Sequence, residues 1–71
     1  MSSRLEDEYS AMLLQKVEQH MRTTRMPPTR FGRESVGDPR FVFDLRAGRE
    51  PRSRTVSKVL RYLERNRGQG S

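Results

Sequence analysis

The sequence predicts an all-α fold of four helices in one domain, residues 1–71. Four segments carry apolar residues at spacings of three and four, the period of one helical face. Proline and glycine fall between these segments, where they end one helix and precede the next. No segment shows the alternation of apolar and polar residues that indicates a strand. A chain of 71 residues has room for one small core.

A long first helix is predicted over residues 3–24, which contain neither glycine nor proline. The acidic residues at 6–8 lie in its first turn, where the helix dipole favours negative charge. Leu14 falls outside the apolar stripe of this helix, so it is either exposed or in contact with a partner chain. The stripe consists of Leu5, Tyr9, Met12, Leu13, Val17 and Met21.

Two short helices are predicted within residues 29–47. The segment Met26-Pro27-Pro28 ends the first helix, because proline lacks an amide hydrogen and restricts the residue before it. Gly37 is suited to the left-handed end of the next helix, and Asp38 and Pro39 are suited to the cap and first position of the one after it. The second helix has Phe31, Ser35 and Val36 on one face, and the third, over residues 39–47, has Phe41, Val42 and Leu45 facing inward.

A fourth helix is predicted over residues 53–66. Gly48 closes the third helix, and residues 49–52 form the connecting loop. Residues 67–71 form a polar, flexible tail. The apolar stripe of the fourth helix consists of Val56, Val59, Leu60 and Leu63.

Composition excludes several classes of function. The chain has no cysteine and a single histidine, so it has no disulfide, no thiol nucleophile and no means of building a zinc-thiolate or imidazole site alone. The longest apolar run, residues 11–14, is far shorter than the roughly 20 residues that span a bilayer. Acidic residues stand where a secretory signal would be apolar. We therefore expect a cytoplasmic, nucleoid-associated protein that is not an enzyme and has no cofactor, metal, membrane or small-molecule ligand.

The charge is distributed unevenly along the chain. The net charge of +6 divides into −2 over residues 1–20 and +8 over residues 21–71. A positive excess of this size attracts polyanions, of which nucleic acid is the commonest in a cell. Thirteen of the 15 basic residues are arginine. That ratio fits phosphate and guanine recognition, and it also fits the codon bias of a GC-rich genome.

The two short helices have the spacing of a helix-turn-helix unit. Such a unit needs a small residue where its helices cross, and apolar residues ten and thirteen positions later. Gly32, Val42 and Leu45 satisfy both intervals, and the apolar Phe31 precedes the glycine. Gly37 comes five residues after Gly32 rather than the usual four, which indicates a longer first helix or a different crossing angle.

Residues 28–63 resemble the lambda-repressor-like (Cro/C1-type) family of helix-turn-helix regulators. The stretch from Leu45 to Pro51, followed by Thr55-Val56, is similar to the family's segment in which the recognition helix ends at glycine, a basic residue and proline follow, and threonine opens the next helix. The segment from Arg30 to Arg33 also looks like that of small bacterial and phage regulators. The resemblance implies a recognition helix that begins at Asp38 and enters the major groove.

The resemblance implies base contacts on the outer face of the third helix. Arg40 is the best candidate, because arginine can bond guanine O6 and N7 together. Phe43 either contacts a thymine methyl or the sugar backbone, or folds back onto the first helix. Asp44 either accepts a hydrogen bond from cytosine N4 or pairs with a neighbouring arginine. With Asp38, the full groove-facing set is Pro39, Arg40, Phe43, Asp44 and Ala47.

Phosphate contacts are expected on both sides of this helix. One group lies at the start of the second helix, where free amides and the dipole favour an anion. The other lies beyond the recognition helix, next to the Ser53 and Thr55 hydroxyls. The candidates are Thr29, Arg30 and Arg33 in the first group, and Arg46, Arg49, Arg52 and Arg54 in the second.

We therefore predict a sequence-specific double-stranded DNA-binding transcriptional regulator, as a repressor that binds a palindromic site as a homodimer. The expected dimer surface is the first helix, with Leu14, Tyr62 or other residues outside the stripes. Two alternatives stay open. One is a protein-interaction regulator, such as an antiactivator or a phage-encoded inhibitor, and the other is a nonspecific nucleic-acid-binding protein.

Overall fold

The computed structural model describes the backbone of residues 2–66 and the side chains of residues 11–66. Residues 2–66 form four helices and no strand: α1 (Ser2–Thr24), α2 (Pro28–Val36), α3 (Phe41–Arg46) and α4 (Ser53–Asn66). The all-α prediction and the order of its four helices are confirmed. The expected tail at 67–71, and the side chains of Leu5 and Tyr9, lie outside the described residues.

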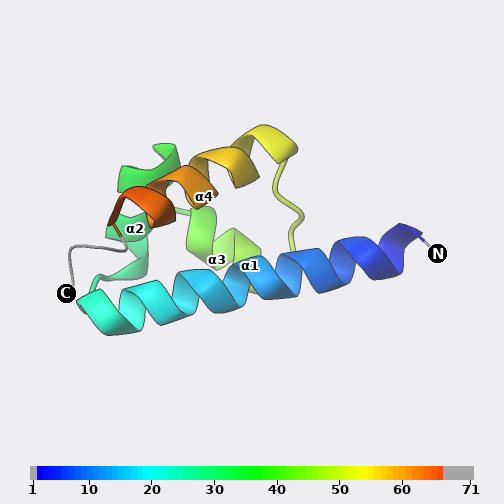
Figure 1. The fold of residues 1–71 in the computed structure, drawn as a ribbon, viewed down its shortest axis with the longest axis horizontal. Coiled ribbons are helices and arrows are strands. Elements are labelled where there is room, and N and C mark those ends of the chain that lie inside the picture. The colour runs from blue at the N-terminus through cyan, green and yellow to red at the C-terminus, as the bar shows by residue number, and fades with distance from the viewer. Residues whose placement is uncertain (1, 67–71) are drawn as a thin grey trace.

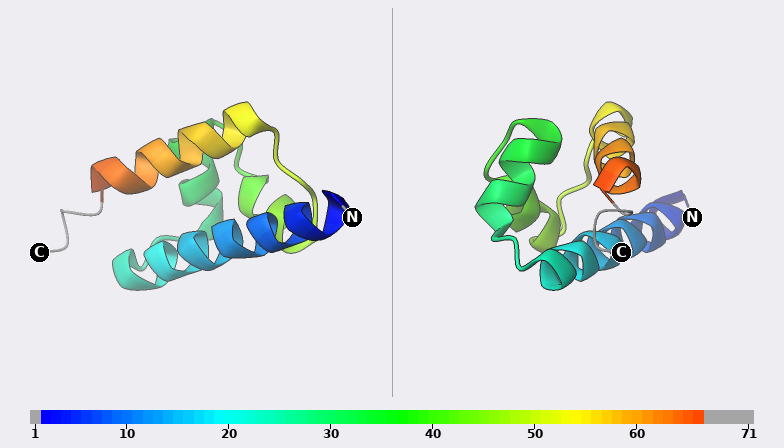
Figure 2. Two further views of the ribbon diagram at one scale, coloured as in Figure 1. Left: turned by 45° about the vertical axis from the view of Figure 1, so that its right-hand side comes forward. Right: turned by 60° about the vertical axis from the view of Figure 1, so that its left-hand side comes forward.

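The long helix α1 lies along one side of the molecule, and α2, α3 and α4 pack together on it (Figure 1). Helix α2 contacts both α3 and α4, while α1 contacts α3 and α4. The turned views show α3 between α1 and the α4 layer, with α2 at the end of the bundle near the close of α1 (Figure 2). The N-terminal turns of α1 extend beyond the other helices (Figure 1).

One apolar core joins all four helices. Phe31, Val17, Val42 and Val59, one from each helix, are fully buried. Their burial confirms the central part of each predicted stripe. The remaining buried core residues are Leu13, Met21, Phe41, Leu45 and Val56.

Two predicted core residues are exposed. Met12 is 54% exposed and Leu60 is 38% exposed, so their inward placement was wrong. The apolar stripes of α1 and α4 are wider than the faces of these helices that other helices cover, so residues at the edge of each stripe remain exposed. Leu14 is half-buried and packs against the core of its own chain rather than being exposed, and its contact with a partner chain stays a prediction.

The third helix is shorter than predicted. Residues 39 and 40 form a turn, and α3 begins at Phe41 rather than at Pro39. The Asp38 side chain does act near this start: its Oδ1 accepts a hydrogen bond from the Arg40 amide at 3.0 Å. Asp38 therefore stabilises the entry turn, and the helix proper starts once the chain has passed the crossing with α2.

Candidate nucleic-acid interface

Helices α2 and α3 approach each other most closely at Gly32. A Cβ atom added to this glycine would overlap the carbonyl oxygen of Asp38 and would lie 3.3 Å from the Cβ of Phe41. The atoms in the way are mainly backbone, which cannot rotate aside as a long side chain can. Gly32 thus sets the distance between the middle of α2 and the turn that leads into α3.

The turn between these helices is closed by backbone hydrogen bonds. Gly37 has φ of 78°, the left-handed conformation that suits glycine. Its amide donates to the Arg33 carbonyl at 3.0 Å, and the Asp38 amide donates to the Gly32 carbonyl at 3.1 Å. The first of these is the 5→1 bond of an αL helix cap, and together the two bonds give partners to the Arg33 and Gly32 carbonyls. Helix α2 consequently continues to Val36, and the glycine that ends it comes five residues after Gly32.

The two faces of α3 differ sharply. Phe41, Val42 and Leu45 are buried against the other helices. The opposite face exposes Phe43, which is 47% exposed, and one turn to either side of it Arg40 and Ala47 are also exposed. Pro39 is exposed as well, so four of the predicted base-contact residues are accessible to solvent.

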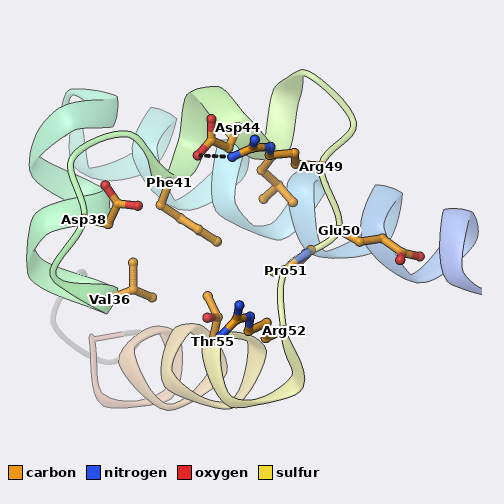
Figure 3. A pocket seen from close by; sticks show the side chains of 10 residues that line it. Val36, Asp38, Phe41, Asp44, Arg49, Glu50, Pro51, Arg52 and Thr55 are labelled. Carbon is orange, nitrogen blue, oxygen red and sulfur yellow. Dashed lines mark ion pairs between the residues drawn. The ribbon is translucent and has the colours of Figure 1, made fainter.

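Asp44 lies apart from this exposed face. It is only half-exposed, and its Oδ2 lies 3.8 Å from Nη1 of Arg49, in the loop after α3. Both residues line an open hollow of about 390 Å³ between α3 and the beginning of α4. The Phe41 ring projects into this hollow, and Thr55 lies across from it (Figure 3). Of the two roles predicted for Asp44, the structure contains the pairing with arginine.

Arg30 is held by a chain of hydrogen bonds that starts on α4. The Tyr62 hydroxyl donates to Oε1 of Glu34 at 2.8 Å, and Nε of Arg30 donates to Oε2 of the same carboxylate at 2.8 Å. The bond from Arg30, followed by that from Tyr62, lowers the pKa of Glu34. Burial, with the bond to Glu34, raises the pKa of Tyr62 to about 12. The chain orients Arg30 beside the start of α2.

Tyr62 also belongs to an aromatic cluster beneath that chain. Its ring meets Phe31 edge to face at 5.3 Å between centroids and His20 at 5.7 Å. His20 in turn lies 5.6 Å from Phe31 and is half-buried. Tyr62 is therefore held by contacts with α1 and α2 of its own chain, and its place in a dimer surface stays a prediction.

Arg46 crosses from α3 to α1. Its Nε donates to Oε2 of Glu18 at 2.7 Å and its Nη2 donates to Oε1 at 2.9 Å. These bonds lower the pKa of Glu18 and raise that of Arg46. The guanidinium carbon also lies 6.0 Å from the centroid of the Phe43 ring. The Phe43 ring is therefore not folded into the core, and the Arg46 that contacts it is bonded to Glu18 of α1.

The other residues predicted to contact DNA have exposed side chains. Arg40 makes no side-chain hydrogen bond or ion pair with another described residue, and the same holds for Arg33, Arg52 and Arg54. All four are exposed, as is Thr29 at the start of α2. They lie on the two sides of α3 in the chain, on α2 and on the loop and first turn of α4. Exposed arginines without a partner among the described residues thus precede and follow α3 along the chain.

Two interactions of the site were not predicted from the sequence: Glu18 with Arg46, and Glu34 with Tyr62. Each joins residues 28 positions apart. The carboxylates gave a partial signal, because both lie near arginines in sequence, but nothing in the chain indicated the distant partner. Glu34 also forms an ion pair with Arg30, four residues before it on α2.

No protein-family model matches the chain, and neither a curated protein nor a solved structure matches it. Within residues 2–66, no helix combines the length and apolar character needed to cross a membrane. Among the described side chains, no three metal-ligating groups come together.

Proposed function

We propose that the protein is a sequence-specific double-stranded DNA-binding regulator in which α2 and α3 form a helix-turn-helix unit. The observation that carries the proposal is the packing at Gly32: α2 meets the backbone of the turn into α3 at Asp38 and the Cβ of Phe41, while Val42 and Leu45 are buried. This packing leaves the opposite face of α3 to solvent, where an exposed helix can enter a major groove.

The distribution of charge supports the same assignment. Arg40 stands at the start of α3, where it can form a two-point contact with guanine. Arg33 precedes α3, and Arg52 and Arg54 follow it, so phosphates on both sides of the groove have partners. Arg30 and Arg49 join them in this proposal, each already oriented by a neighbouring carboxylate. Neutralising several phosphates makes binding strongly salt-dependent.

The proposal includes a homodimer that represses transcription by occupying a palindromic site. A single six-residue α3 presents few side chains to the bases, so a second copy is needed for tight and specific binding. The half-sites would lie about one helical turn apart. Selecting bound sequences from a pool of random duplexes tests specificity, symmetry and spacing together.

The decisive variants are Arg40→Ala and Arg33→Ala, with Arg65→Ala in the last turn of α4 as the control that removes an equal charge. Arg40→Ala should weaken binding to the selected site by about 1–3 kcal/mol and relax one base preference. Arg33→Ala should weaken binding to all duplexes alike and reduce the salt slope by about 1. Arg65→Ala should do neither.

Two results would reject the proposal in favour of another function. If random duplex competes as well as the selected site at moderate salt, the protein binds nucleic acid without specificity. If Arg40→Ala with Arg46→Ala stays folded and keeps full biological activity, the helical scaffold acts through a protein partner instead.

A further inference from the structure

Phe43 is the large apolar residue on the outer face of α3. It lies between Arg40, three residues before it, and Ala47, four residues after it, and both of those neighbours are exposed. In an α-helix such positions lie side by side, so phenylalanine and alanine form an apolar strip next to the arginine. In a major groove, the apolar feature that this strip can meet is the C5-methyl group of thymine.

The Phe43 ring has a neighbour that restricts its position. The guanidinium carbon of Arg46 lies 6.0 Å from the ring centroid, within the range of a cation–π contact. Arg46 is itself fixed, because two of its N–H groups bond both oxygens of Glu18 on α1. A bidentate pair sets the plane of a guanidinium as well as its place. The orientation of the ring is therefore linked through Arg46 to α1.

This arrangement gives Arg46 a different role from that of the unpaired arginines. Glu18 neutralises its charge and occupies two of its donors, whereas Arg33, Arg52 and Arg54 keep their donors available. We propose that Phe43 reads a thymine methyl in the major groove and that Arg46, held by Glu18, is the positioning residue for its ring. This inference rests on the proposed function and names one base that the regulator recognises.

The first experiment compares thymine with uracil, which lacks only the methyl group. Sites are selected from random duplexes with the wild-type protein and with Phe43→Ala, and the thymine preferred only by the wild type is then replaced by uracil. Losing one buried methyl should weaken wild-type binding about fourfold. Phe43→Ala should bind the two duplexes equally well, whereas Phe43→Leu, which keeps apolar area, should retain part of the discrimination.

The second experiment separates positioning from a phosphate contact. If Arg46 positions the ring, Arg46→Ala and Glu18→Gln should both bring the thymine-to-uracil affinity ratio toward one, and Arg46→Lys should restore part of it. If Arg46 binds phosphate instead, Arg46→Ala should weaken all duplexes alike and lower the salt slope by about 1, with the ratio unchanged. In that case Glu18→Gln should strengthen binding, because it frees the arginine. Thermal melts with each variant verify that it is folded.

The outcomes distinguish this inference from the function on which it rests. If no sequence is enriched by the wild type, both are wrong. If a site is enriched and the wild type binds thymine and uracil equally at every position, the regulator stands and the role of Phe43 is overturned. A ratio that falls in Phe43→Ala and not in Arg46→Ala overturns the positioning role alone.

Discussion

Replacing Gly32 with alanine tests the closest contact in the fold. Helix propensity alone predicts that alanine stabilises α2 by up to about 1 kcal/mol. The structure predicts the opposite, because the added methyl group would overlap the Asp38 carbonyl and press on Phe41. Relieving that overlap requires the turn after Gly37 to move.

The magnitude follows from the contacts that must change. Overpacking a close contact costs about 1–3 kcal/mol. Moving the turn also weakens the 3.1 Å bonds that join the Asp38 amide to Gly32 and the Phe41 amide to Asp38, worth about 1 kcal/mol each. Set against the gain in propensity, the net loss is about 2 kcal/mol. For a domain of this size, such a loss lowers the midpoint of thermal unfolding by about 8–16 °C.

Urea unfolding followed by far-UV circular dichroism measures this effect, with Arg33→Ala as the matched control. Arg33 is the next residue of α2, is exposed, and has a helix propensity close to that of alanine. It should change the free energy of unfolding by less than about 0.5 kcal/mol. A Gly32→Ala protein as stable as the wild type, or more so, would show that α2 does not pack directly against the backbone of the turn at Asp38, and would remove the main support for the proposed unit.

Three further predictions concern single side chains. Gly37→Ala should lower the free energy of unfolding by about 1 kcal/mol in urea titrations, because φ of 78° is unfavourable for alanine; an unchanged midpoint would contradict the left-handed turn. The bond from Arg46 holds the pKa of Glu18 below its ordinary value of 4.5. The pair therefore stabilises the folded state above pH 4.5, and this contribution is lost as the pH falls through the lowered pKa. Glu18→Gln should therefore reduce stability at neutral pH by up to about 1 kcal/mol and by less in acid, and equal losses at both pH values would count against the pair. The pKa of Tyr62 is raised to about 12 in the folded protein, so its neutral hydroxyl stabilises the fold below pH 10 and this stabilisation is lost as pH rises toward 12. Denaturation curves of Tyr62→Phe should therefore show a smaller loss of stability in alkali than those of the wild type. A loss as steep as that of the wild type would mean that other groups cause it.

Local features of the chain were enough to predict the elements of the fold. Pro27 and the glycines at 37 and 48 lie between the helices, and Pro28 begins α2. The buried centres of the stripes, such as Val17, Val42 and Val59, were predictable because a helix places every third or fourth residue on the same side. The close crossing at Gly32 was predictable from spacing along the chain, because Val42 and Leu45 follow it by the ten and thirteen residues that a helix-turn-helix unit requires.

The extent of each buried face was decided by packing. Met12 and Leu60 continue the stripes of α1 and α4, yet both are exposed, because periodicity indicates a direction and not how far a neighbouring helix reaches. For a related reason, α3 begins at Phe41 and not at the predicted Pro39. The crossing at Gly32 brings the Asp38 carbonyl against α2, and the chain forms a turn before the helix begins.

The candidate site divides in the same way. The sequence by itself determined that Phe43 lies opposite the buried Val42 and Leu45 and that arginines precede and follow α3 along the chain, because helical period and residue order require no partner. Only the tertiary structure decided which of those arginines have carboxylate partners. Arg46 meets Glu18, and Glu34 meets Tyr62, across 28 residues of chain. Such pairs form only when separate helices pack together. Nothing in the sequence of one helix indicates which residue of another helix will face it.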